Sequence, residues 1–150
     1  MRHLSIEEIL YLHFRLINRT GGAHGIRDLG LLQSAAGRPY ASYDGVEPYP
    51  EVFEKAGVLA HSIISNHPFI DGNKRTGIAS AGMFLRKNGY TLKTSQEEMV
   101  VFTLAIARGE VEWQAISAWL KKFCISLMRG STSEAVTTRK VDGAKWEIYL

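Results

Sequence analysis

The stretch His67-Pro-Phe-Ile-Asp-Gly-Asn-Lys-Arg-Thr-Gly77 carries the most information in this chain. The nine residues from His67 to Arg75 combine an imidazole, a carboxylate, a glycine, an amide and two adjacent cations. An imidazole can accept a proton near neutral pH, and a carboxylate can hold Mg²⁺ beside phosphate oxygens. A glycine lets backbone N–H groups turn toward an anion. On residue types alone, the stretch is either a nucleotide phosphate site or an ordinary polar turn.

Two apolar helices are expected on either side of this loop. Apolar residues recur at helical spacing from Val52 to Asn66, and a slim helix rich in glycine and alanine is predicted from Lys74 to Lys87. Lys74 and Arg75 then lie in the first turn of the second helix, where the helix dipole disfavours cations. A bound anion would remove this conflict, which favours the phosphate site.

Further helices are predicted outward from this pair. Ser5 with Glu8, and Ser95 with Glu98, have the spacing of a capping box, and Asp28 is suited to cap a short helix. The expected outer helices span about residues 6–17, 28–37, 95–107 and 112–128. A loop is expected over Asn18–Gly25, and a long loop or short hairpin over Arg38–Pro50. Residues 1–128 are therefore expected to form one domain, followed by a flexible tail at 129–150.

Composition limits the class of protein. The chain has 150 residues, of which 45% are hydrophobic and 22% charged, as in one soluble globular domain. No signal peptide and no membrane-spanning stretch are recognisable, and the one cysteine, Cys124, is expected to be a small buried hydrophobe. A lone thiol cannot form an internal disulfide, which favours the cytoplasm. The net charge of +3 favours an acidic partner without indicating direct nucleic-acid binding.

The run from His67 to Arg75 resembles the signature of the Fic/Doc family, whose pattern is H-P-F-x-[D/E]-G-N-x-R. The segments Gly25-Ile-Arg-Asp28, Leu31-Leu-Gln-Ser-Ala35 and Arg38-Pro39 are similar to the Doc (death-on-curing) branch, and the resemblance covers about Leu4 to Cys124. It implies an all-α fold, a Fic/Doc-like helical bundle in which a central helix pair carries the motif loop and a short flap or hairpin accompanies it.

The resemblance also implies roles for individual residues. His67 matches the catalytic base, which accepts the proton of a target Ser, Thr or Tyr hydroxyl, and Asp71 matches the residue that binds Mg²⁺. The nucleotide phosphates, expected from ATP, would be bound by Gly72, Asn73, Lys74 and Arg75. The flap is expected over Arg38–Pro50, with the target contacted by Arg38, Pro39, Tyr40, Ala41 and Ser42.

Positions 72, 74 and 78 bear on which group is transferred. Members that transfer an adenylyl group mostly have glycine where this chain has Lys74 and arginine where it has Ile78, whereas Asn-Lys-Arg is the rule in the Doc branch. Gly72, in contrast, follows the adenylyl-transferring pattern. The resemblance therefore favours phosphorylation of a target protein, such as translation elongation factor Tu, over the alternative of AMPylation.

A third alternative, from another class, is an inactive or nucleic-acid-binding regulatory module that has kept the motif.

Regulation of the enzyme is expected to come from outside the chain. The inhibitory pattern [S/T]-x-x-x-E-[G/N] found in many Fic proteins is absent from the sequence. An enzyme of this family without that inhibitory pattern would be toxic, so we expect a toxin with a cognate antitoxin in trans.

Overall fold

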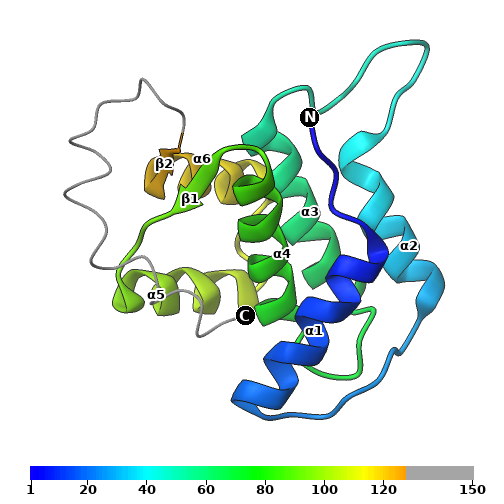
Figure 1. Ribbon diagram of the computed structural model, residues 1–150, viewed down its shortest axis with the longest axis vertical. Coiled ribbons are helices and arrows are strands. Elements are labelled where there is room, and N and C mark those ends of the chain that lie inside the picture. Colours follow the sequence, from blue (N-terminus) through cyan, green and yellow to red (C-terminus); the bar gives the residue numbers. More distant parts are fainter. Residues whose placement is uncertain (128–150) are drawn as a thin grey trace.

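The computed structural model describes residues 1–127, and these are mainly helical (Figure 1). Their helices are α1 (Ile6–Thr20), α2 (Leu29–Gly37), α3 (Val52–Asn66), α4 (Asn73–Lys87), α5 (Gln96–Ala107) and α6 (Trp113–Phe123). A 3₁₀ turn, η1, spans Arg38–Tyr40, and two short strands are β1 (Tyr90–Leu92) and β2 (Cys124–Ser126). The predicted fold class, a helical bundle around a central helix pair, is confirmed.

The helices α3 and α4 form the centre of the bundle. α3 packs against α4 on one side and α6 on another, and α1 covers α4. The two central helices approach closely because glycine occupies the crossing: a Cβ atom at Gly77 would lie 2.7 Å from Cγ1 of Ile64. Large side chains such as Ile63 and Phe84 are fully buried between them and their neighbours. α4 is thus the slim helix predicted from the sequence. The loop between α3 and α4 is anchored at each end by a helix that is buried in the core.

The predicted helix starts agree with the structure. Ser5 and Glu8 form both halves of a capping box at α1, and the side chains of Asp28 and Ser95 accept hydrogen bonds from the first turns of α2 and α5. These caps satisfy N–H groups that a helix leaves without a partner. α1, however, continues to Thr20, so the loop that follows it is shorter than predicted.

The prediction of a last helix from Glu112 to Met128 is wrong at its C-terminal end. α6 ends at Phe123, and Cys124–Ser126 pair as β2 with β1 in antiparallel register. The apolar spacing continues past Phe123, but pairing with a strand distant in sequence overrides it. Cys124 is half-buried in β2, and burial raises the pKa of its thiol to about 12. Its side chain therefore packs as a neutral thiol, as expected for a residue without a nucleophilic role.

The segment between η1 and α3 is anchored at its base and exposed at its tip. The buried ammonium of Lys55, on α3, donates to the carbonyl of Pro39 and to the carboxylate of Glu47, each at 3.0 Å. At the tip, Tyr43 and Val46 exchange backbone hydrogen bonds of 2.9 Å, which gives the short hairpin allowed for in the prediction. Figure 1 shows this segment at the N-terminal end of α3, whereas the motif loop lies at its C-terminal end.

None of the helices within residues 1–127 is both long and apolar enough to cross a membrane. The tail predicted at residues 129–150 lies outside the described residues.

Candidate functional site

The motif loop between α3 and α4 forms the floor of a cleft of about 320 Å³. Its lining consists of His67, Ile70, Asp71, Gly72, Asn73, Lys74, Arg75 and Thr103. The structure thus gathers in one cleft the predicted base, the predicted metal ligand and the four predicted phosphate-binding residues. Thr103 comes from α5, which forms the facing wall.

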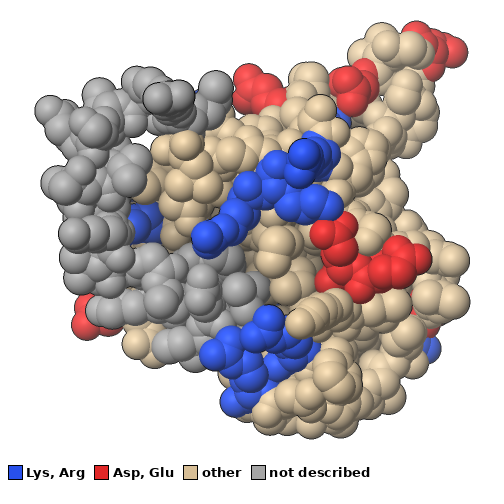
Figure 2. All heavy atoms as spheres, in the orientation of Figure 1, with Lys and Arg blue, Asp and Glu red and all other residues tan. Residues whose placement is uncertain are grey.

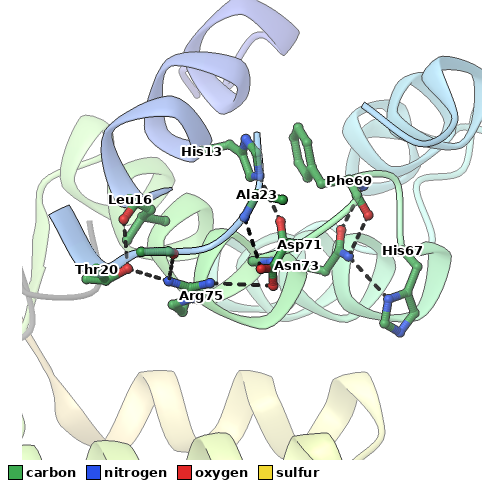
Figure 3. Close-up of polar contacts among 11 residues, drawn as sticks. His13, Leu16, Thr20, Ala23, His67, Phe69, Asp71, Asn73 and Arg75 are labelled. Carbon is green, nitrogen blue, oxygen red and sulfur yellow. Dashed lines mark hydrogen bonds and ion pairs between the residues drawn. The ribbon is translucent and has the colours of Figure 1, made fainter. Parts of the chain in front are cut away.

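The side chain of Asn73 holds the loop together from inside (Figure 3). Its Oδ1 accepts from the N–H of Phe69 at 2.9 Å, and its Nδ2 donates to the carbonyl of Phe69, also at 2.9 Å. Asn73 is buried, so its amide is committed to this loop, and only its backbone N–H remains for an anion. The predicted phosphate-binding role of Asn73 is therefore available to its main chain and not to its side chain.

The same amide orients the imidazole of His67. Nδ2 of Asn73 lies 3.2 Å from Nδ1 of His67, and the contacts with Phe69 fix which end of the amide faces the ring. Because an amide nitrogen only donates, Nδ1 is the acceptor, and the neutral ring carries its proton on Nε2. His67 itself is exposed and ends α3 in the left-handed conformation, with φ 48° and ψ 55°.

The carboxylate of Asp71 is held by backbone N–H groups from two segments. Oδ2 accepts from Ala23 at 3.1 Å and Oδ1 from Gly72 at 2.8 Å. These hydrogen bonds, that from Ala23 first, lower the pKa of Asp71, with a further contribution from the cation of Arg75, 3.7 Å away. The carboxylate is thus ionised at neutral pH and still half-exposed, as a cation ligand must be.

The guanidinium of Arg75 is tied to the C-terminal end of α1. Nη1 donates to Oγ1 of Thr20 and to the carbonyl of Gly21, the latter at 2.9 Å, while Nη2 faces Asp71. Thr20 can accept because its own hydroxyl hydrogen goes to the carbonyl of Leu16. The arginine is thus held at the cleft by α1, with Asp71 beside it.

Behind the loop, His13 of α1 supports the backbone of Asp71. Its ring stacks on Phe69 with centroids 3.8 Å apart, and Nε2 lies 2.8 Å from the carbonyl of Asp71. A carbonyl only accepts, so Nε2 of His13 carries a proton. Burial lowers the pKa of His13, which keeps the ring neutral in this apolar position.

A segment that we call the strap, residues 23–28, runs along the motif loop. The N–H groups of Arg27 and Asp28 donate to the carbonyl of Pro68 at 2.7 and 3.0 Å, and Ile70 donates to the carbonyl of Gly25 at 3.1 Å. The guanidinium of Arg27 reaches the carbonyls of His67 and Asn66. The strap and the motif loop therefore behave as one hydrogen-bonded unit.

The family of this chain follows from comparison with known proteins. The model of the Fic/DOC family matches residues 3–85, which is more than half of the chain. The chain belongs to the Fic/DOC family. It is 47% identical over 72 residues to Toxin Doc of Mycolicibacterium smegmatis, a match that covers 48% of this chain and 55% of that protein. It is 34% identical over 122 residues to Protein kinase doc of Escherichia phage P1, covering 81% of this chain and 95% of that protein.

The start of α4 suits the nucleotide phosphates used in this family. Gly72 is the N-cap, so the first N–H groups of α4 point out of the helix toward the cleft, and Lys74 and Arg75 follow in the first turn. No acidic residue balances the dipole in that turn. An anion bound there would complement both the dipole and the two cations.

The residues present also fit Mg²⁺. Within residues 1–127 no three His, Cys, Asp or Glu side chains gather into a metal cluster. A magnesium ion held beside phosphates needs only one or two carboxylates, and the other ligands are phosphate oxygens and water. The ionised, half-exposed Asp71 at the edge of the α4 N-terminus meets that requirement.

The predicted target-contacting residues Arg38–Ser42 lie apart from the cleft lining. Arg38 donates to Oγ of Ser62 at 2.9 Å and lies 3.4 Å from Nδ1 of His61, which places it along α3. A helix of 15 residues is about 22 Å long, so the hairpin tip at the far end of α3 is well removed from His67. The role of Arg38–Ser42 in this Fic/DOC protein stays a prediction.

Several residues that shape the site carry little signal in the sequence. Ala23 acts through its backbone, and Thr103 reaches the cleft only because α5 packs beside α4. His13 lies on the apolar side of α1, where a histidine would ordinarily be taken for a core residue. Arg27 stands inside the Doc-like segment Gly25–Asp28, but nothing in its spacing shows what it contacts.

Proposed function

We propose that this protein is the toxin of a toxin–antitoxin system and transfers the γ-phosphoryl group of ATP to a hydroxyl of a target protein. One observation carries the proposal: His67, Asp71 and the N-terminus of α4 share a single cleft. The relative called Protein kinase doc, which matches 81% of this chain, supports phosphoryl transfer in particular.

Each residue of the cleft has a distinct role in such a transfer. The N–H groups of the α4 start, with Lys74 and Arg75, bind and orient the phosphates. Asp71 would hold Mg²⁺, which when bound would offset the charge of the phosphate oxygens. The target hydroxyl oxygen forms a bond to the γ-phosphorus as the bond to ADP breaks, and the hydroxyl proton passes to the imidazole of His67. In the free protein the lone pair of that ring is at Nδ1, 3.2 Å from Nδ2 of Asn73, so the ring takes up the proton at Nδ1 as the target hydroxyl replaces Asn73 as its partner.

The arrangement of α4 favours phosphoryl over adenylyl transfer. Ile78 is 2% exposed and part of the core, so the position where adenylyl-transferring members carry an arginine supplies no phosphate ligand. Lys74, in contrast, lines the cleft and adds bulk and charge at the start of the helix. AMPylation by the same residues is the alternative, and Gly72 is the position in its favour.

The mass of a modified target separates these two reactions. The purified protein is incubated with ATP, Mg²⁺ and elongation factor Tu as the first candidate target. We expect a gain of one phosphoryl group, whereas a gain of AMP would establish the alternative. His67→Ala, with its thermal unfolding measured as a control for folding, should lower the rate by about 10²–10⁴-fold. Transfer at an unchanged rate in that variant would remove His67 from the mechanism.

A toxin of this kind should stop growth when it is expressed alone. We expect arrest with the wild-type chain, none with His67→Ala at equal protein level, and relief when the cognate antitoxin is co-expressed. Normal growth with folded wild-type protein would contradict the toxin proposal. The proposed site of action is the cytoplasm, where ATP and translation factors are found.

A regulatory module that binds nucleic acid is the remaining alternative. On the face shown in Figure 2, Lys and Arg side chains of the described residues form separate groups, and a group of Asp and Glu side chains lies beside the upper one. The described part of that face therefore presents no continuous basic path for a phosphate backbone. Salt-dependent DNA binding that is unchanged by His67→Ala would favour this alternative over the enzyme.

A further inference from the structure

We infer that Arg27 is a positioning residue for His67, because its guanidinium fixes the backbone from which the imidazole projects. The inference rests on the proposed function, since it concerns the residue that accepts the proton there. Arg27 is absent from the cleft lining, so it acts on the reaction through His67 and not on the nucleotide.

The end of α3 needs support at this point. His67 is in the left-handed conformation, which costs about 1–2 kcal/mol for a residue other than glycine. Such a conformation persists only where neighbouring contacts impose it. The last carbonyls of a helix also have no partner within the helix, and they form the negative end of its dipole.

The guanidinium of Arg27 meets both needs. Nε donates to the carbonyl of His67 at 2.6 Å, and Nη2 donates to the carbonyl of Asn66 at 2.8 Å. Two donors in a rigid planar fork fix the relative position of two successive carbonyls, which a lysine ammonium cannot do. The positive charge lies at the negative end of the helix, where it is favourable.

Arg27 is exposed, but its backbone is held in place. Its backbone N–H and that of Asp28 both donate to the carbonyl of Pro68. The strap therefore contacts three successive carbonyls, those of Asn66, His67 and Pro68. From the other side, Asn73 faces the His67 ring.

Loss of the guanidinium would leave the carbonyls of Asn66 and His67 to water and free the left-handed residue to relax. The imidazole would then move relative to a γ-phosphate bound at α4. A displacement of about 1 Å can cost as much as 10²-fold in rate. The phosphate-binding groups of α4 would stay in place, so the effect should fall on the rate of transfer rather than on ATP binding.

Three full-length variants test this: Arg27→Gln, Arg27→Lys, and Arg15→Gln as a matched control. Arg15 is an exposed arginine on α1 whose guanidinium lies over the ring of Tyr11. We expect Arg27→Gln to lower kcat about 10- to 100-fold with the KM for ATP within twofold, and Arg27→Lys to recover part of the loss. Arg15→Gln should behave as wild type. Equal kcat in Arg27→Gln and Arg15→Gln, or a loss confined to KM, would overturn the inference.

A second measurement separates this inference from the proposed function. The ¹⁵N chemical shifts of the His67 ring report its tautomer and surroundings whether or not the target is known. We expect unprotonated Nδ1 in the wild type, and a changed or averaged signal in Arg27→Gln but not in Arg15→Gln. An unchanged His67 signal in Arg27→Gln would refute positioning even if transfer were observed. Absence of transfer in the wild type would instead count against the proposed function alone.

Discussion

The motif loop at the C-terminal end of α3 and the segment 41–50 at its N-terminal end are held in different ways. The motif loop is bonded on one side by the strap and on the other by the buried amide of Asn73. The other segment is fixed at its base by Lys55, but Tyr43 and Val46 at its tip are 69% and 67% exposed. The first end is therefore held as rigidly as the proposed transfer needs, whereas the tip of the second is exposed.

The most damaging single change should be removal of the Asn73 side chain. Asn73→Ala leaves the N–H and the carbonyl of Phe69 without partners in a buried loop. We expect a loss of about 2–4 kcal/mol in the free energy of unfolding, together with loss of transfer, measured by urea denaturation and by target modification. A variant as stable as the wild type would show that the motif loop is held mainly by the strap.

A matched pair of glycines compares the two loops directly. Gly72 and Gly45 have nearly the same left-handed φ, 78° and 77°, so alanine is strained at both. A Cβ at Gly72 would also lie 3.0 Å from Cδ1 of Ile17, whereas at Gly45 there is no atom within 4 Å among the described residues. We expect Gly72→Ala to cost about 2–3 kcal/mol and Gly45→Ala about 1 kcal/mol. If urea denaturation gave the same loss in the free energy of unfolding for both variants, the side chain of Ile17 would have to move aside at little cost.

The base of the segment 41–50 should be the next most sensitive position. Lys55→Met keeps the apolar stem of the side chain but removes the donor to Pro39 and Glu47. We expect a loss of about 1–2 kcal/mol and faster amide hydrogen exchange over residues 41–50, with exchange in the motif loop unchanged. Faster exchange in both loops would mean that the two ends of α3 are coupled.

The sequence predicted the elements that local patterns define. Ser5, Asp28 and Ser95 cap helices where the spacing of polar residues indicated, and the apolar periodicity located α3 and α4. The motif residues also meet in one cleft, because a short loop between two helices leaves them little freedom. Caps, apolar periodicity and a short loop all depend on residues that are close in sequence, so a single sequence is enough to predict them.

What the sequence did not show depends on contacts between distant segments. The pairing of β1 with β2 ends α6 at Phe123, although the helical spacing continues beyond it. The bonds from Ala23 to Asp71 and from Arg27 to His67 join residues about forty or more positions apart, and each of them has a backbone group as one partner. No residue type or spacing encodes such a bond, so the part of the site that positions the base required the structure.

The smallest expected effect is a pH dependence that arises midway between the two ends of α3. Burial and the nearby cation of Arg38 lower the pKa of His61 from its usual value of 6.5, while Glu112 acts in the opposite sense. Oγ of Ser65, 3.5 Å from Nε2, is neutral. The unfolded chain therefore takes up a proton at His61 at a higher pH than the folded chain does. As the pH falls below about 6.5, the free energy of unfolding should decrease.

In the variant His61→Gln the free energy of unfolding should decrease less as the pH falls. The decrease that remains is expected from His13, whose pKa is also lowered. Urea denaturation of the wild type and of His61→Gln between about pH 5 and 7.5 provides the measurement. Hydrogen exchange over the two loops in the same pH range would locate the effect. A loss of stability that stays the same in His61→Gln would assign the pH dependence to the motif-loop end, where His13 supports Asp71. A loss that disappears would assign it to the side of α3 that anchors Arg38.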